Sequence, residues 1–158
     1  MSESVNKRLD ELEAIFIENG IPANCPLKHK FVGGMYVRTI FMPKGTIIVS
    51  LTHNQDHPFF VLQGKAIVYD ENNGNQIIEA PHDGITLKGT RRVLEILEDC
   101  IWCTTHITNI LPIDHSEEAI EIAAAKVVEE VTLIRDNSIL GGKLINNVFM
   151  PNPELIKE

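Results

Sequence analysis

The chain has 158 residues, a net charge of −8 and a sequence pI near 5.2. This length fits one domain that buries a hydrophobic core of its own. The acidic balance disfavours a nucleic-acid partner, because a phosphate backbone is held by clustered Lys and Arg. No apolar run reaches the ~20 residues of a membrane-spanning helix, and the charged first residues lack the apolar block of a secretory signal. We therefore expect a cytoplasmic protein with neither a membrane nor a nucleic-acid partner.

The first 30 residues predict a helix followed by a connector. Apolar residues at positions 5, 9, 12, 15 and 16 recur at spacings of three and four, which is the stripe of an amphipathic helix over residues 4–19. Asn19-Gly20 is a natural helix stop. The Pro-containing residues 21–30 indicate an irregular connector.

Residues 31–112 change to short β-like runs separated by turn residues. Strands are expected at 34–42, 45–53, 57–70, 76–81, 84–87, 91–97 and 100–108. Asn73-Gly74 is a strong hairpin signal between two of them. Many short strands with no helix between them indicate a mainly β protein, an antiparallel barrel or sandwich.

Residues 113–158 turn helical again. Asp114 or Ser116 can cap a helix that runs to about residue 131, since Glu117 and Glu118 suit its first turn. The Gly- and Pro-containing tail after it is expected to pack on the barrel or on a partner subunit.

The three cysteines suit a reducing compartment, because they cannot all pair within one chain. Cys100 and Cys103 have C-x-x-C spacing, but their surroundings predict a strand. Residues three apart on a strand face opposite sides, so we interpret these cysteines as structural.

Residues 43–64 resemble the first motif of the cupin superfamily. Val61-Leu62-Gln63-Gly64 matches the closing signature of that motif. Counting back from Gly64, His53 falls on the second motif histidine and His57 on the motif glutamate. Leu51 stands where the first motif histidine is expected.

Residues 82–92 resemble the second cupin motif. Gly84 is its first glycine, Leu87 stands for the turn proline, Gly89 is the turn glycine and Arg92 takes the place of the third histidine. The resemblance covers the central half of the chain and implies a cupin-type jelly-roll barrel, to which the residue patterns add the N-terminal and C-terminal flanking helices. It also implies a homo-oligomer, with a dimer favoured. The chain is similar as well to cupin-like proteins of unassigned role encoded by bacteriophages.

Three histidines are candidate ligands for one divalent transition metal. Four residues of straight strand span about 13 Å, but a turn at residues 54–56 can bring His53 and His57 together. His106 can be the third ligand if Trp102 and Thr104 share its inward face, whereas the opposite strand phase would turn Ile101, Cys103 and Thr105 inward. Imidazoles are suitable donors for zinc, iron, nickel or copper. Alternatively, these histidines form hydrogen bonds at the barrel mouth.

Arg92 is the main departure from the motif. If Leu94 and Ile96 face inward, so does Arg92, while Arg91 and Glu95 face solvent. A guanidinium inside the barrel repels a cation and needs an anion or several acceptors. It can bind an anionic ligand, with Gln55 and Tyr36 as further ligand-binding candidates. Alternatively, it forms an internal salt bridge with Asp56, Asp83 or Glu79.

Three functions follow from these residues. The first is a small-molecule-binding cupin with a degenerate metal site that holds an anion through Arg92. The second is a metal-dependent cupin enzyme, a dioxygenase or isomerase, that uses His53 and His57. The third is a non-enzymatic structural or virion-associated module. Whether the protein is an enzyme stays open, because one fold hosts many chemistries.

Overall fold

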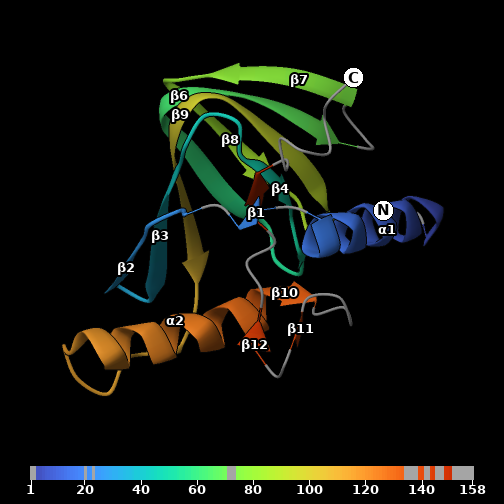
Figure 1. The fold of residues 1–158 in the computed structure, drawn as a ribbon. Helices are drawn as coiled ribbons and strands as arrows, with labels where there is room; N and C mark the ends of the chain where they lie inside the picture. The colour runs from blue at the N-terminus through green and yellow to red at the C-terminus, as the bar shows by residue number, and fades with distance from the viewer. Residues whose placement is uncertain are drawn as a thin grey trace, which may run out of the picture.

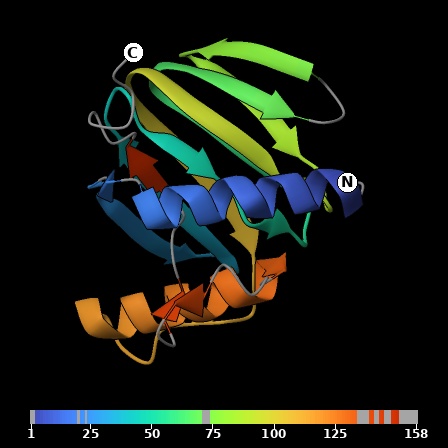
Figure 2. The ribbon, with the colours of Figure 1, turned by 45° about the vertical axis from the view of Figure 1, so that its right-hand side comes forward.

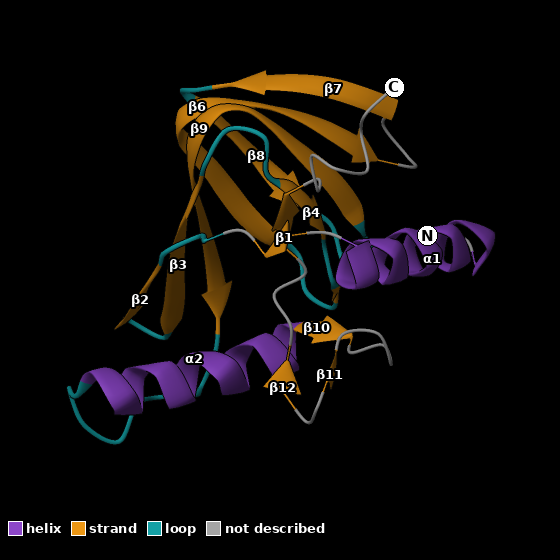
Figure 3. Ribbon diagram, viewed as in Figure 1, coloured by secondary structure: helices purple, strands orange, loops and turns teal. Residues whose placement is uncertain are grey.

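The computed structural model describes residues 3–19, 21–22, 24–70, 74–133, 139–140, 143–144 and 148–150. Its helices are α1 (Glu3–Asn19) and α2 (Glu117–Val131), and its strands, shown in Figures 1 and 3, are β1 (Ile21–Pro22), β2 (Leu27–Val32), β3 (Met35–Met42), β4 (Ile47–Val49), β5 (Thr52–His53), β6 (His57–Asp70), β7 (Gly74–Glu79), β8 (His82–Thr86), β9 (Arg92–Ile107), β10 (Thr132–Leu133), β11 (Ile139–Leu140), β12 (Lys143–Leu144) and β13 (Val148–Met150). None of the described helices is long and apolar enough to cross a membrane.

The described strands form one nine-stranded antiparallel sheet and two short pairs. The sheet folds into two layers because β6 and β9 are long enough to belong to both, as their curved course in Figure 1 shows. One layer contains β2, β3, β8, the first part of β6 and the last part of β9. The other contains β1, β4, β7, β13 and the remaining parts of β6 and β9. The predicted mainly β antiparallel barrel with flanking helices is confirmed.

Gly64 forms the corner where β6 passes from one layer to the other. The pairing of β6 with β9 shifts register on both sides of this residue, which is the signature of β-bulges that bend a strand. The backbone of Gly64 has a φ of 93°, and a Cβ there would lie 2.2 Å from the Asp99 carbonyl oxygen. Only glycine fits, so the last residue of the V-L-x-G signature makes the bend.

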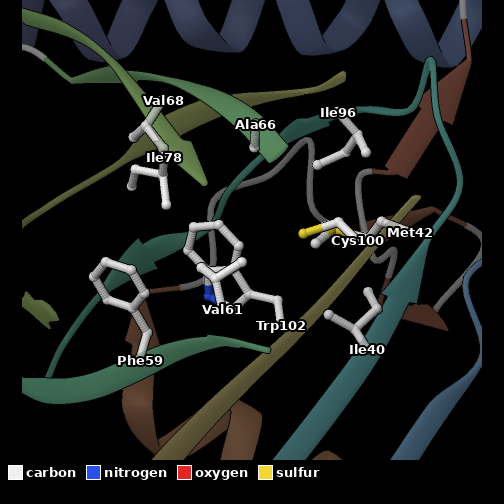
Figure 4. Close-up of a cluster of buried hydrophobic side chains, with 10 residues drawn as sticks. All are labelled: Ile40, Met42, Phe59, Val61, Ala66, Val68, Ile78, Ile96, Cys100 and Trp102. Carbon is white, nitrogen blue, oxygen red and sulfur yellow. The ribbon is translucent and has the colours of Figure 1, made fainter. Parts of the chain in front are cut away.

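The core lies between the two layers. Figure 4 shows its buried side chains, which come from β3, β6, β7 and β9. Phe59 and Trp102 stack at its centre, with ring centroids 4.9 Å apart. Alternate residues of each strand fill this space, as the two-residue period of a strand requires.

Three strand assignments differ from the sequence-based expectation. The strand expected at 45–53 is divided into β4 and β5, because residues 50–51 belong to neither strand. The strands expected at 91–97 and 100–108 are one strand, β9, in which Glu98 and Asp99 are exposed at the bend and form no turn. β2 begins at Leu27, within the expected connector and four residues before the barrel boundary at 31, because Leu27, His29 and Phe31 alternate with exposed lysines. The predicted hairpin of β6 and β7 is confirmed, because the two strands pair antiparallel up to the partners Asp70 and Gly74. Gly20, Asn73 and the tail beyond Met150 lie outside the described residues.

α2 closes one end of the barrel. Ser116 is its N-cap and accepts a hydrogen bond from the Ala119 backbone N–H at 3.2 Å, which confirms one of the two predicted caps. The buried face of α2 presents Ala124, Val127 and Val131 to Tyr36 of β3. In Figure 2 the helix lies below the ends of β2 and β3.

α1 lies across the barrel, as Figure 2 shows. Asp10 of this helix accepts a hydrogen bond from Arg91 at 2.6 Å, which is the one ion pair found among the described residues. Arg91 also donates through Nε to the Ser50 carbonyl at 3.0 Å. The expectation that Arg91 faces solvent is wrong, since its side chain is 1% exposed. Arg91 is buried because α1 covers this side of the barrel. A buried guanidinium requires acceptors, and Asp10 and the Ser50 carbonyl supply them.

Candidate functional site

A cavity of about 160 Å³ lies between the two layers, with the last turn of α2 at one end. Strands β3, β4 and β9 contribute most of its wall. The polar side chains in its lining are Tyr36, Arg38, Ser50, His53, His57, Thr86, Arg92, Thr104, His106 and Thr132. Trp102, Thr104 and His106 share the inward face, so the structure selects the first of the two strand phases considered for β9.

Two arginines, Arg38 of β3 and Arg92 of β9, line this cavity, and no Asp or Glu is found among the described residues of its lining. Burial lowers the pKa of both guanidiniums, yet an arginine stays charged in proteins. Neither forms an ion pair with a described residue. The cavity therefore carries two positive charges that the described residues of its walls do not neutralise.

Arg92 is held in a defined orientation. Its guanidinium donates to the Thr86 hydroxyl and lies over the Phe59 ring, 5.2 Å from the centroid. Its backbone N–H donates to the Ser50 hydroxyl at 2.8 Å. A cation over an aromatic face gains electrostatic stabilisation from the ring.

The expected internal salt bridge of Arg92 is not present among the described residues. Asp56 instead accepts a hydrogen bond from the Lys88 backbone N–H at 2.6 Å. Asp70 acts on Arg92 only through its charge, which raises the pKa against the larger effect of burial. The head group of Arg92 thus keeps donors available toward the cavity.

Three histidines gather at the end of the cavity near α2. The ring centroids of His53 and His57 are 4.8 Å apart, and those of His57 and His106 are 4.3 Å apart. Burial lowers the pKa of His53 to about 3, and the neighbouring His57 and Arg92 act in the same direction. Burial and His57 likewise lower the pKa of His106 to about 3. These two imidazoles are therefore neutral at neutral pH.

His57 has a fixed tautomer. Its Nδ1 lies 3.1 Å from the backbone carbonyl oxygen of Gln55, and a carbonyl only accepts, so this nitrogen carries the proton. Burial also lowers the pKa of this ring, against a smaller opposite effect of the Gln55 hydrogen bond. The neutral ring then presents an unprotonated Nε2, which is a hydrogen-bond acceptor.

The surroundings of the three histidines fit an anion better than a divalent cation. Imidazoles are suitable metal donors, but two guanidiniums line the same cavity and repel a cation. Within the described ranges, no group of three or more His, Cys, Asp or Glu side chains is arranged to hold a metal ion. A metal at His53, His57 and His106 stays a prediction, and we derive no chemistry through one.

The other predicted ligand residues occupy two different places. Tyr36 lines the cavity and its hydroxyl lies 2.6 Å from His29 Nδ1. Gln55 lies outside the lining and donates through Nε2 to the Ile107 carbonyl at 3.0 Å. Sequence reasoning missed Arg38. It stands two residues after Tyr36 on the same strand, and the two-residue period that brings Tyr36 inward was the available signal.

Neither a family model nor a curated protein matches the sequence. Solved structures similar to the chain include the cupin domain of Cnp3 from Schizosaccharomyces pombe, with 18% identity, a TM-score of 0.47 and coverage of 56% of this chain and 65% of that chain. An acetylacetone dioxygenase from Acinetobacter johnsonii has 16% identity and a TM-score of 0.46, with coverage of 57% and 68%. An RmlC-like cupin family protein from Methanocaldococcus jannaschii has 7% identity and a TM-score of 0.47, with coverage of 54% and 82%.

Proposed function

We propose that the protein binds a small anion inside its barrel, between Arg38 and Arg92. The observation that carries this proposal is the pair of guanidiniums in a cavity where the described part of the lining offers no carboxylate to either of them. An enclosed guanidinium without a counter-charge is costly, and a bound anion removes that cost. Arg92 is already oriented by Thr86 and Phe59, so less conformational entropy is lost when the ligand binds.

The size of the cavity limits the ligand. A cavity of about 160 Å³ is close to the ~150 Å³ that accommodates a benzene molecule, which corresponds to a ligand of roughly 6–10 non-hydrogen atoms. Apolar side chains such as Ile40, Met42 and Leu94 form part of the wall. A small organic anion, with a charged group and a short carbon skeleton, matches this lining.

Calorimetric titration with acetate, succinate and inorganic phosphate in a chloride buffer tests the proposal. We expect at least one anion to bind, and Arg92→Met and Arg38→Met each to weaken it about tenfold or more, because a charge-assisted contact is lost. Lys126→Met removes an exposed positive charge on α2 and is the matched control. Equal affinity in the arginine variants and the wild type would reject the site.

Elemental analysis of protein purified without chelator or metal-affinity resin separates the alternatives predicted from the sequence. One equivalent of a transition metal, lost in a His53→Ala/His57→Ala variant, would favour the metal-dependent enzyme over the anion-binding protein. Binding of neither a metal nor an anion would leave the structural module. Cytoplasmic location and a homodimer stay predictions that accompany each of these functions.

A further inference from the structure

The histidine end of the cavity contains polar atoms without partners. His53 Nδ1 and His106 Nδ1 are buried and have no hydrogen-bond partner among the described residues. Both side chains line the cavity, and His106 is 6% exposed. A buried polar atom left unpaired is destabilising. Two residues at the histidine end of the cavity thus each contain a ring nitrogen that no described residue satisfies.

A carboxylate does not complement His57 at this end of the cavity. His57 donates from Nδ1 to the Gln55 carbonyl, so the Nε2 of its neutral ring accepts and requires a donor from the ligand. An ionised carboxylate offers no donor. A hydroxyl both donates and accepts, and can therefore serve His57 together with whichever nitrogens of His53 and His106 carry protons.

The arginines and the histidines lie close together along the same wall of the cavity, at successive inward positions of β3 and β9. In the pairing of β3 with β9, Tyr36 stands opposite His106 and Arg38 opposite Thr104. Thr104 in turn stands opposite Phe59, over which the Arg92 guanidinium lies. Successive inward residues of a strand are about 7 Å apart. One small molecule can thus reach the arginines with one group and the histidines with another.

We infer that the ligand is a small hydroxylated anion, whose acidic group contacts Arg38 and Arg92 and whose hydroxyl donates to His57 Nε2. This inference rests on the proposed anion site and adds the hydroxyl. The acidic group can be a carboxylate or a phosphate ester, and both suit guanidinium donors. The histidine end then discriminates between anions that differ only in a hydroxyl.

Calorimetric titration with matched pairs of anions tests the inference. The pairs are propionate with 2-hydroxypropionate, succinate with 2-hydroxysuccinate, and ethyl phosphate with 2-hydroxyethyl phosphate. In at least one pair, the hydroxylated member should bind about tenfold tighter or more, because it satisfies a buried acceptor. Comparison of the hydroxylated members with one another identifies the acidic group, since the tightest of them carries either a carboxylate or a phosphate.

His57→Phe removes the acceptor and keeps a ring of similar size. This variant should bind both members of a pair equally, at the affinity of the non-hydroxylated member for the wild type. Lys126→Met should keep the wild-type preference. Circular dichroism checks that His57→Phe is folded, and His57→Gln, which keeps an acceptor, should retain part of the preference.

The outcomes separate the inference from the function on which it rests. Anions that bind the wild type with no preference in any pair would overturn the hydroxyl and leave the arginine site. A preference that persists in folded His57→Phe would overturn the role of His57. If no anion of any pair binds, the proposed function fails and the inference fails with it.

Discussion

Acid should destabilise the fold before any carboxylate titrates, because buried neutral histidines oppose protonation. The pKa of His53 and the pKa of His106 are about 3 in the folded protein, against an ordinary value near 6.5. The unfolded chain therefore binds more protons between these values. The stabilising contribution of each ring is fully present above pH ~6.5 and is lost as the pH falls toward ~3.

The magnitude follows from the difference in proton binding. One pKa unit corresponds to ~1.4 kcal/mol, so moving from pH 8 to pH 5 costs about 2 kcal/mol for each of the two rings. His57, whose pKa is also lowered by burial, acts in the same direction. Asp and Glu titrate mainly below pH ~5, so this interval isolates the histidines.

Urea unfolding at pH 8 and pH 5 measures this loss. The chain has a single tryptophan, and Trp102 is buried, so its fluorescence reports unfolding. His106→Phe should reduce the pH dependence of the unfolding free energy by about 2 kcal/mol, and His115→Asn, which removes a histidine at an exposed position, is the matched control. A wild-type protein that is equally stable at both pH values would refute the reasoning.

Three further substitutions test the fold. Gly64→Ala should cost about 3 kcal/mol or more, because its Cβ would collide with the Asp99 carbonyl at the bend; an unchanged urea midpoint would contradict the role of this glycine. Arg91→Met should cost about 3–5 kcal/mol because it breaks the buried ion pair with Asp10, and a double-mutant cycle with Asp10→Asn gives their coupling, with zero coupling as the contrary result. Ser116→Ala should lower the thermal midpoint through a loss of about 1 kcal/mol at the α2 cap, and an equal midpoint would show that the cap contributes nothing.

The sequence allowed the strands to be predicted where turn residues stood at both ends. β6 has the bounds expected from its flanking turns. β9 was expected as two strands, since Glu98 and Asp99 resemble a turn. The bend that exposes them depends on Gly64 of a different strand, and local residue preference does not contain that information.

The site could be predicted in part for a similar reason. The two-residue period of a strand correctly predicted that Arg92 faces inward. It could not show that α1 covers the opposite face, on which Arg91 lies. Arg91 is therefore buried against Asp10, although alternation alone sends it to solvent. Whether Arg38 and Arg92 have a counter-charge in the cavity also depends on where the fold places the Asp and Glu side chains. Local sequence does not contain that information.

Ser50 has a consequence for how the protein should be prepared. Its carbonyl accepts from Arg91, which holds α1, and its hydroxyl accepts from the backbone of Arg92 in the cavity wall. Deleting the first 19 residues would therefore remove α1 and with it the Asp10 contact of Arg91, which is the chain neighbour of Arg92 in the cavity wall. A shortened barrel is a poor substitute for the whole chain in screening, since weak binding by it would report a disturbed wall.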